Sequence, residues 1–107
     1  MRIVISICLL FVLAGCKKST STSNCIQSKV DEFRSQARCV GANVKEYFFE
    51  GKIVYVFYKG LCFVDAGAQV YDEDCNYLGM LGGLAYNKKI GGVDFGVTAE
   101  YKRTIWE

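Results

Sequence analysis

Residues 44–59 read Val-Lys-Glu-Tyr-Phe-Phe-Glu-Gly-Lys-Ile-Val-Tyr-Val-Phe-Tyr-Lys, and this stretch decides the fold. The segments Val44–Phe49 and Ile53–Lys59 are rich in aromatic and β-branched residues, which favour strands. Between them stands Glu50-Gly51, where the glycine supplies the positive φ of a tight hairpin turn. The stretch therefore predicts two antiparallel strands joined by a short turn.

Further strand signals follow this hairpin. A second hairpin is predicted from Ala68–Asp72 and Tyr77–Leu81, around a polar turn at residues 73–76. Residues 97–105 alternate apolar and polar side chains, which favours a half-buried strand over the alternative, a short helix. The glycine-rich residues 82–96 are predicted to be loop, with at most a weak strand near Ala85.

A helix is predicted before the first hairpin, over residues 24–38. Its signal is an apolar stripe at i, i+4, i+7 and i+11, formed by Ile26, Val30, Phe33 and Ala37. Asn24 is the expected N-cap, with Gln27 reaching back as in a capping box, and Gly41 suits a left-handed stop. Together these elements predict an α+β fold, in which one N-terminal helix packs on an antiparallel sheet of four or five strands.

The start of the sequence predicts an export signal over residues 1–15, followed by Cys16. Met1-Arg2 is followed by the uncharged run Ile3–Val12, which is about half of the ~20 residues that a membrane-spanning helix needs. The next four residues, Leu13-Ala14-Gly15-Cys16, resemble the bacterial lipobox at every position. That resemblance implies cleavage before Cys16, with acyl chains added to its sulfur and its new amino group. The alternative is an ordinary secretory signal with a chance cysteine.

We therefore expect three parts in the chain. Residues 1–15 are a lipoprotein signal peptide that is removed, residues 16–23 are a lipidated cysteine and flexible tether, and residues 24–107 are a single domain. The expected partner is a lipid bilayer, bound through acyl chains such as palmitate on Cys16, because several chains make a persistent anchor. Lys17-Lys18 either attracts anionic headgroups or is a solvated part of the tether.

The cysteine count predicts two disulfides in the domain. Of six cysteines, one leaves with the signal and Cys16 carries lipid, so four remain in an oxidising compartment. A straight helix holds Cys25 and Cys39 about 21 Å apart, whereas a disulfide needs roughly 7 Å. Cys62 and Cys75 lie at opposite ends of one predicted strand, so they are also disfavoured as a pair. Cys39 precedes the first strand and Cys62 follows the second, so both should lie at the same end of the sheet. We therefore predict Cys39–Cys62, with Cys25 at the far end of the helix bonded to Cys75. A four-cysteine zinc site is disfavoured because the spacings are wide.

Composition and charge argue against several function classes. The chain has no histidine, which removes the usual general base at neutral pH and the commonest metal ligand. It has 13 basic and 11 acidic side chains, and loss of one basic residue with the signal leaves a net charge of +1. That balance gives no clustered basic face for nucleic acid. No serine stands beside a base in a catalytic motif. We therefore expect no enzymatic activity, no cofactor and no nucleic-acid partner.

One turn raises a weak metal hypothesis. Asp72, Asp74 and Asn76 lie at i, i+2 and i+4, as at the start of a calcium-binding loop. However, Tyr77 stands where that loop needs glycine, and Gly83 stands where it needs a bidentate glutamate. A hairpin turn rich in Asp and Asn explains the same residues by turn propensity, so the turn interpretation is favoured.

An excess of aromatic residues suggests a binding surface on the first hairpin. Successive strand residues point to opposite faces, so both faces there are apolar, and the predicted helix covers only one. One interpretation is that the C-terminal segment covers the other face through Tyr101, Ile105 and Trp106. The other interpretation is an exposed partner surface. Its candidate residues are Tyr47, Phe49, Tyr55, Tyr58 and Trp106.

Four short segments carry a family resemblance. They are Cys25–Lys29 (Cys-Ile-Gln-Ser-Lys), Tyr55–Tyr58 (Tyr-Val-Phe-Tyr), Asp74–Gly79 (Asp-Cys-Asn-Tyr-Leu-Gly) and Thr104–Trp106 (Thr-Ile-Trp). These segments resemble a family of small envelope lipoproteins of Bacteroides-type bacteria. The resemblance implies no known activity and no functional residues.

The expected location is the bacterial cell envelope, with the lipid anchor in the outer membrane at its periplasmic or its surface face. Surface-directed members of that family often carry acidic residues after the lipidated cysteine, but Lys17-Lys18-Ser19-Thr20 stands here, so both the membrane and its face stay open. The leading functional hypothesis is a protein- or ligand-binding module, with an envelope protein as the candidate partner. The alternative is a structural envelope component without a specific ligand, and an enzyme ranks third.

Overall fold

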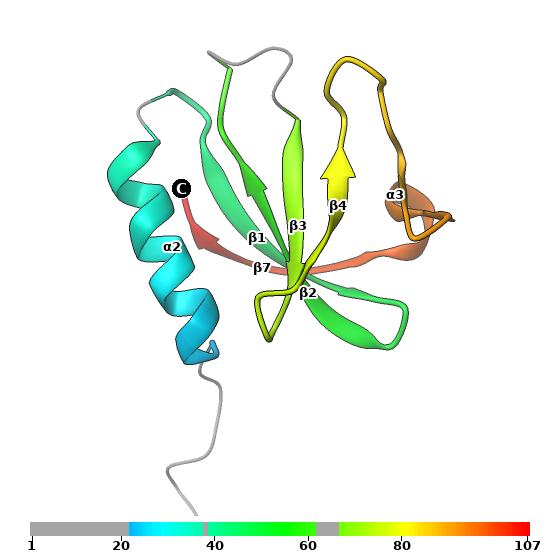
Figure 1. The fold of residues 1–107 in the computed structure, drawn as a ribbon, viewed down its shortest axis with the longest axis horizontal. Coiled ribbons are helices and arrows are strands. Elements are labelled where there is room, and N and C mark those ends of the chain that lie inside the picture. The colour runs from blue at the N-terminus through cyan, green and yellow to red at the C-terminus, as the bar shows by residue number, and fades with distance from the viewer. Residues whose placement is uncertain (1–21, 38, 62–66) are drawn as a thin grey trace, which may run out of the picture.

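The aromatic hairpin lies in the middle of the sheet (Figure 1). The structure is a computed structural model, and it describes residues 22–37, 39–61 and 67–107. β1 (Asn43–Phe49) and β2 (Lys52–Tyr58) pair antiparallel, in a register that places Phe49 opposite Lys52. Glu50 and Gly51 form the turn with φ angles of 51° and 79°, which confirms the predicted positive φ of the glycine.

Three further strands extend this hairpin. They are β3 (Ala68–Asp72), β4 (Tyr77–Leu81) and β7 (Glu100–Trp106). The strand order is β4-β3-β2-β1-β7 and each neighbouring pair is antiparallel, so the C-terminal strand forms one edge beside β1. The prediction of an α+β fold, with one main helix on an antiparallel sheet, is confirmed for the described residues, and the sheet has five strands.

One face of the sheet is covered by α2 (Asn24–Gln36). Ile26 and Val30 are 0% and 2% exposed, which confirms the buried side of the predicted apolar stripe. They pack in one cluster with buried residues of β1 and β2, namely Val44, Tyr55 and Phe57. Ile105 and Trp106 of β7 join this cluster, because a β-bulge in the pairing with β1 lets two consecutive side chains face α2.

The first turn of α2 is capped by Ser23. Its Oγ accepts a hydrogen bond from the backbone N–H of Ile26 at 3.3 Å. The prediction that Asn24 is the N-cap is therefore wrong. The preceding residue, Ser23, is an equally good capping residue and takes that position, and Asn24 is already the first residue of the helix. The helix ends at Gln36, and Gly41 (φ 89°) lies in the following turn rather than directly after the last helical residue.

The opposite face of the sheet is covered by residues 89–99. Two short strands, β5 (Lys89–Ile90) and β6 (Val93–Asp94), pair with each other and lead into the helical turn α3 (Phe95–Thr98). Ile90 and Phe95 are 5% and 6% exposed. They complete a second cluster with Phe49, Val54, Val56 and Val70. Figure 1 shows α2 and α3 on opposite sides of the sheet.

This cover corrects two predictions. Residues 82–96 are not only loop, because they contain β5, in which Ile90 is buried. The sequence shows no hydrophobic periodicity there, because its apolar residues stand singly among glycines. The C-terminal segment does not lie over the second face, because β7 pairs with β1 at the edge of the same sheet. That strand begins at Glu100, and Val97 is 85% exposed on α3.

A disulfide joins the helix to the sheet within the described residues. It links Cys25 in α2 to Cys75 in the β3–β4 turn, with the two Cα atoms 6.1 Å apart, which confirms that part of the predicted connectivity. The other predicted pair, Cys39–Cys62, includes a residue that lies outside the described part of the chain, as do Cys16 and the signal.

Candidate functional site

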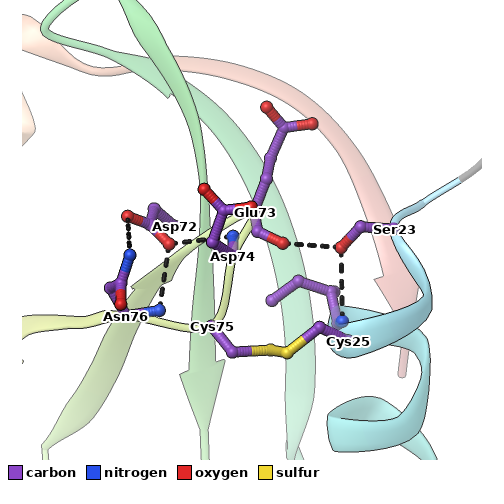
Figure 2. Close-up of a disulfide and its surroundings, with 8 residues drawn as sticks. Ser23, Cys25, Asp72, Glu73, Asp74, Cys75 and Asn76 are labelled. Carbon is purple, nitrogen blue, oxygen red and sulfur yellow. Dashed lines mark hydrogen bonds between the residues drawn. A yellow bond between two sulfur atoms is a disulfide. The ribbon is translucent and has the colours of Figure 1, made fainter.

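The start of the domain is fastened to two parts of the sheet. Ser23 Oγ donates a hydrogen bond to the carbonyl oxygen of Glu73 at 2.7 Å, and Figure 2 shows the disulfide beside this bond. Thr22 Oγ1 accepts a hydrogen bond from Arg103 Nη2 at 3.2 Å. The chain therefore enters the domain at a fixed place, which we call the junction (Thr22, Ser23 and the disulfide).

The β3–β4 turn beside the junction is organised by the carboxylate of Asp72 (Figure 2). Its Oδ1 accepts hydrogen bonds from the backbone N–H groups of Asp74 and Asn76, each at 2.9 Å, and its Oδ2 accepts one from Asn76 Nδ2 at 3.1 Å. Burial raises the pKa of Asp72, but the hydrogen bonds from Asn76 and Asp74 outweigh burial and lower it below the ordinary value. The carboxylate thus stays ionised and holds the turn.

The calcium alternative at Asp72, Asp74 and Asn76 does not fit this geometry. N–H donors surround the Asp72 oxygens that a cation would need, and Asn76 presents its amide nitrogen to them. In the part of the chain that the structure describes, no group of three His, Cys, Asp or Glu side chains is arranged to hold a metal ion. These residues form the hairpin turn that turn propensity predicts.

The aromatic residues predicted as a partner surface do not share one surface. They are Tyr47, Phe49, Tyr55, Tyr58 and Trp106. The rings of Tyr47 and Phe49 lie against Phe95 beneath the 89–99 cover, with centroids 5.1 and 4.9 Å away. Tyr55 and Trp106 pack under α2, on the other face. Phe49 and Tyr55 are only 3% and 2% exposed, so the predicted surface is corrected: these two side chains are buried on opposite faces of the hairpin.

Tyr55 is buried close to an ion pair. Arg103 Nη2 lies 3.1 Å from Glu46 Oε1, and the Glu46 side chain is only 13% exposed. Burial raises the pKa of Tyr55 to about 12, and the negative charges of Glu46 and Glu73 add to this shift while Arg103 opposes it. The phenol therefore stays protonated at neutral pH inside the cluster under α2.

We predict that Tyr55 makes the domain less stable as pH rises from 10 to about 12. The folded state binds the phenol proton of Tyr55 more tightly than the unfolded state. The contribution of this proton to the free energy of unfolding is therefore complete below pH 10 and is lost as the pH approaches the folded-state pKa. Urea unfolding of the wild type and of Tyr55→Phe, measured on both sides of pH 10, isolates the effect. Parallel pH dependences of the two proteins would contradict it.

A groove lies between α2 and the strands β2 and β3. Two adjoining hollows, of about 140 and 190 Å³, share Phe33, Gln36 and Lys59. The lining of both together is Lys29, Glu32, Phe33, Gln36, Ala37, Phe57, Lys59, Gln69 and Tyr71. Its floor is aromatic and its rim is polar.

Edge-to-face contacts order the aromatic floor of the groove. The ring centroid of Phe57 lies 5.4 Å from that of Phe33 and 5.5 Å from that of Tyr71. The Tyr71 hydroxyl donates to Gln69 Oε1 at 3.1 Å, so Gln69 presents its amide nitrogen as a donor. Lys29 Nζ lies 4.2 Å from the Tyr71 ring centroid. The groove thus combines an apolar base with oriented donors.

The sequence gives only a faint signal for this groove. Lys29, Glu32 and Gln36 lie at i, i+3 and i+7 beside the apolar stripe of the helix, and Gln69 and Tyr71 share one face of β3. Such spacing is equally typical of a solvated face. The residues become one site only when the helix packs on β2 and β3, which no local pattern reveals.

A braced turn after β4 exposes two large apolar side chains. Gly82 and Asn87 exchange backbone hydrogen bonds of 2.8 and 3.2 Å, and the Asn87 side chain donates to two nearby carbonyl oxygens. Leu84 and Tyr86 are 77% and 81% exposed. Tyr86 has a φ of 53°, in the left-handed region that residues with side chains rarely enter. We call residues 83–86 the exposed turn.

We predict that Tyr86→Gly raises the free energy of unfolding by about 0.5–1 kcal/mol. The left-handed backbone costs an L-residue about 1–2 kcal/mol, and glycine removes that cost while making the unfolded chain freer. Leu84→Gly is the matched control, because Leu84 is equally exposed but has no positive φ, and it should lower stability. Urea unfolding that finds both variants destabilised to the same degree would contradict the prediction.

Comparisons with known proteins give one match. A family described as Domain of unknown function (DUF6970) matches residues 31–107, from within α2 to the end of β7 and beyond. No curated protein and no solved structure matches the chain. Among the described residues, no helix is long and apolar enough to cross a membrane. The resemblance to small envelope lipoproteins stays a prediction. Because the match spans more than half of the sequence, the chain belongs to the DUF6970 family of domains of unknown function.

Proposed function

We propose that the mature protein is a lipid-anchored binding module of the bacterial cell envelope. The anchor is supported by Leu13-Ala14-Gly15-Cys16, which fits the lipobox at all four positions. The junction sets the length of the tether, because the chain is already bonded to the domain at Thr22. Only the stretch from Cys16 to Thr22 is left as tether, and it reaches at most about 21 Å. A tether of that length keeps the domain close to a bilayer.

Cys16→Ser tests the anchor. We expect the wild-type protein in the membrane fraction, with a mature chain that begins at Cys16 and carries the mass of its acyl chains. The variant should lose that mass and move to the soluble fraction. Separation of the inner and outer membranes then shows which of the two contains the protein. A wild-type chain that keeps its first fifteen residues and carries no acyl chain would overturn the anchor.

A second disulfide, Cys39–Cys62, belongs to the same proposal. The backbone N–H of Leu61 donates to the carbonyl oxygen of Val40 at 3.0 Å. A Cβ atom on Gly60 would lie 2.8 Å from the Cys39 Cβ atom. The chain that leads to Cys62 therefore passes directly beside Cys39. Peptide mapping without reduction should find the two cysteines linked, and a Cys39 peptide linked elsewhere would contradict the pair.

The groove beside α2 is the observation that carries the binding proposal. Small-molecule binding sites combine an apolar lining with a few convergent polar groups, and the groove has both. Its rim presents the ammonium of Lys29 and the amides of Gln36 and Gln69 against one carboxylate, Glu32. A small ring-bearing anion fits this balance best, because its ring lies on the aromatic floor and its charge meets the donors. A sugar acid is one such molecule.

Glucuronate tests the groove, with glucose as its neutral match. Amide NMR spectra of the mature chain carrying Cys16→Ser should show resonances of α2, β2 and β3 that move with glucuronate and much less with glucose. Lys29→Gln removes one charged donor and should weaken glucuronate binding by about tenfold. Lys102→Gln, on the edge strand β7, is the control and should leave binding unchanged. Neither sugar moving a groove resonance would count against this site.

The alternative, a structural envelope component without a ligand, is supported by the covered sheet. The two clusters close both faces of the hairpin. The β7 edge carries two bulges and several charges, which disfavour the addition of a foreign strand. A deletion strain separates the two proposals. If Lys29→Gln restores the wild-type envelope as fully as the native gene, the structural role is favoured, and if only the native gene does, the groove is.

A further inference from the structure

We infer that the exposed turn (residues 83–86) is a docking site for a protein partner, whose receiving surface is an apolar pocket with an acidic rim. The inference goes beyond the groove, which lies beside α2. It rests on the proposed anchor at Cys16, because the place of the anchor decides which way the turn faces.

The exposed turn presents its apolar side chains without using them inside the domain. Leu84 and Tyr86 belong to neither buried cluster. The hydrogen bonds made by Gly82 and Asn87 hold the backbone, so little conformational freedom is left to lose when a partner binds. An aromatic residue held in the left-handed region, with its ring in solvent, is an outlier of the kind that gathers at binding sites. Tyrosine is also a frequent anchor of protein interfaces.

Two lysines give the surface its charge preference. Lys88 and Lys89 directly follow the turn and both are exposed. Asp94 lies opposite Lys89 in the β5–β6 pair, but its Oδ1 accepts the hydrogen bond that caps α3. From residue 81 to residue 93 the chain has no acidic side chain. An apolar tip flanked by two cations is complementary to an apolar pocket with carboxylates at its rim.

The position of the turn argues for a protein rather than the chain's own bilayer. β4 begins beside the β3–β4 turn, to which the junction is fixed, and ends at the exposed turn (Figure 1). A five-residue strand alone separates these two ends by about 17 Å. With the anchor at the junction end, the exposed turn faces away from the membrane.

Photocrosslinking in native cells tests the docking site. The photoreactive residue p-benzoylphenylalanine replaces Tyr86 or Leu84, and as control it replaces Val97, which is 85% exposed on α3. Positions 84 and 86 should give the same protein adduct, which position 97 should not give. Lys88→Glu with Lys89→Glu should lower the adduct yield about tenfold. Lysines in place of the identified partner's acidic rim should restore it.

Several results would overturn the docking site. They are adducts with lipid alone, adducts with a second copy of this chain, adducts formed equally at position 97, adducts insensitive to the lysine reversals, and no adduct at all. Tyr86→Gly serves as the folding control, because it is expected to keep the fold while abolishing docking. Membrane fractionation of the same cells tests the anchor independently, because it shows whether the protein is membrane-bound. A soluble protein that still gives the adduct disproves only the anchor, whereas a membrane-bound protein without the adduct disproves only the docking.

Discussion

Replacing both Cys25 and Cys75 by alanine is expected to lower the free energy of unfolding by about 4 kcal/mol. The two cysteines are 50 residues apart in sequence, and the disulfide restricts the unfolded chain across that whole span. A small domain has roughly 5–15 kcal/mol of stability in all. The variant should therefore unfold at a much lower urea concentration, and part of the population should be unfolded even without urea.

A control separates this effect from damage to the helix. Ser28→Ala alters an exposed residue of α2 near the disulfide and should change stability by less than about 0.5 kcal/mol. The double alanine variant is compared with the wild type by urea unfolding, and circular dichroism without urea measures the folded fraction from which each protein starts. A loss of under 1 kcal/mol would mean that the disulfide adds little to contacts that already hold α2 in place.

Phe95→Ala is expected to destabilise the domain by about 3–5 kcal/mol. The ring is 6% exposed and lies between Tyr47 and Phe49, so its removal opens a cavity in the second cluster. It also takes away the main apolar contact of α3 with the sheet. Residues 89–99 should then come away from the sheet before global unfolding, with faster amide hydrogen exchange in β5 and β6.

Val97→Ala is the matched control for Phe95→Ala. Val97 lies two residues further along the same helical turn but is 85% exposed, so its truncation should change stability by less than about 0.5 kcal/mol. Similar losses for the two variants would mean that helix propensity in α3, rather than burial of the ring, controls the cover. That outcome would contradict the assignment of Phe95 to a core.

The central hairpin and α2 are predictable from sequence because each carries its own local signal. Glu50-Gly51 stands between two runs of aromatic and β-branched residues, and the observed φ of Gly51 is the one that such a turn demands. The stripe that contains Ile26 and Val30 has helical period and is buried. The Cys25–Cys75 link followed from these elements, since topology alone brings the start of the helix to the β3–β4 turn.

The cover formed by residues 89–99 on the opposite face of the sheet is not predictable in the same way. Ile90 and Phe95 stand singly among glycines and polar residues, so no period marks them, and they are buried only because the opposite face of the sheet needs a cover. The predicted aromatic surface is wrong for the same reason: no local pattern shows that the ring of Phe95 covers Phe49. The groove beside α2 likewise arises from packing and leaves no signature in any single element.

The place of the disulfide has a mechanical consequence. If the anchor and a partner at the exposed turn pull against each other, tension enters at the start of α2 and passes through the disulfide to Cys75, two residues before β4. It then runs along the covalent backbone of that one edge strand and leaves at residue 83. Neither α2 nor the ladders between the inner strands lies on this path, so the domain can transmit a force without being unravelled by it.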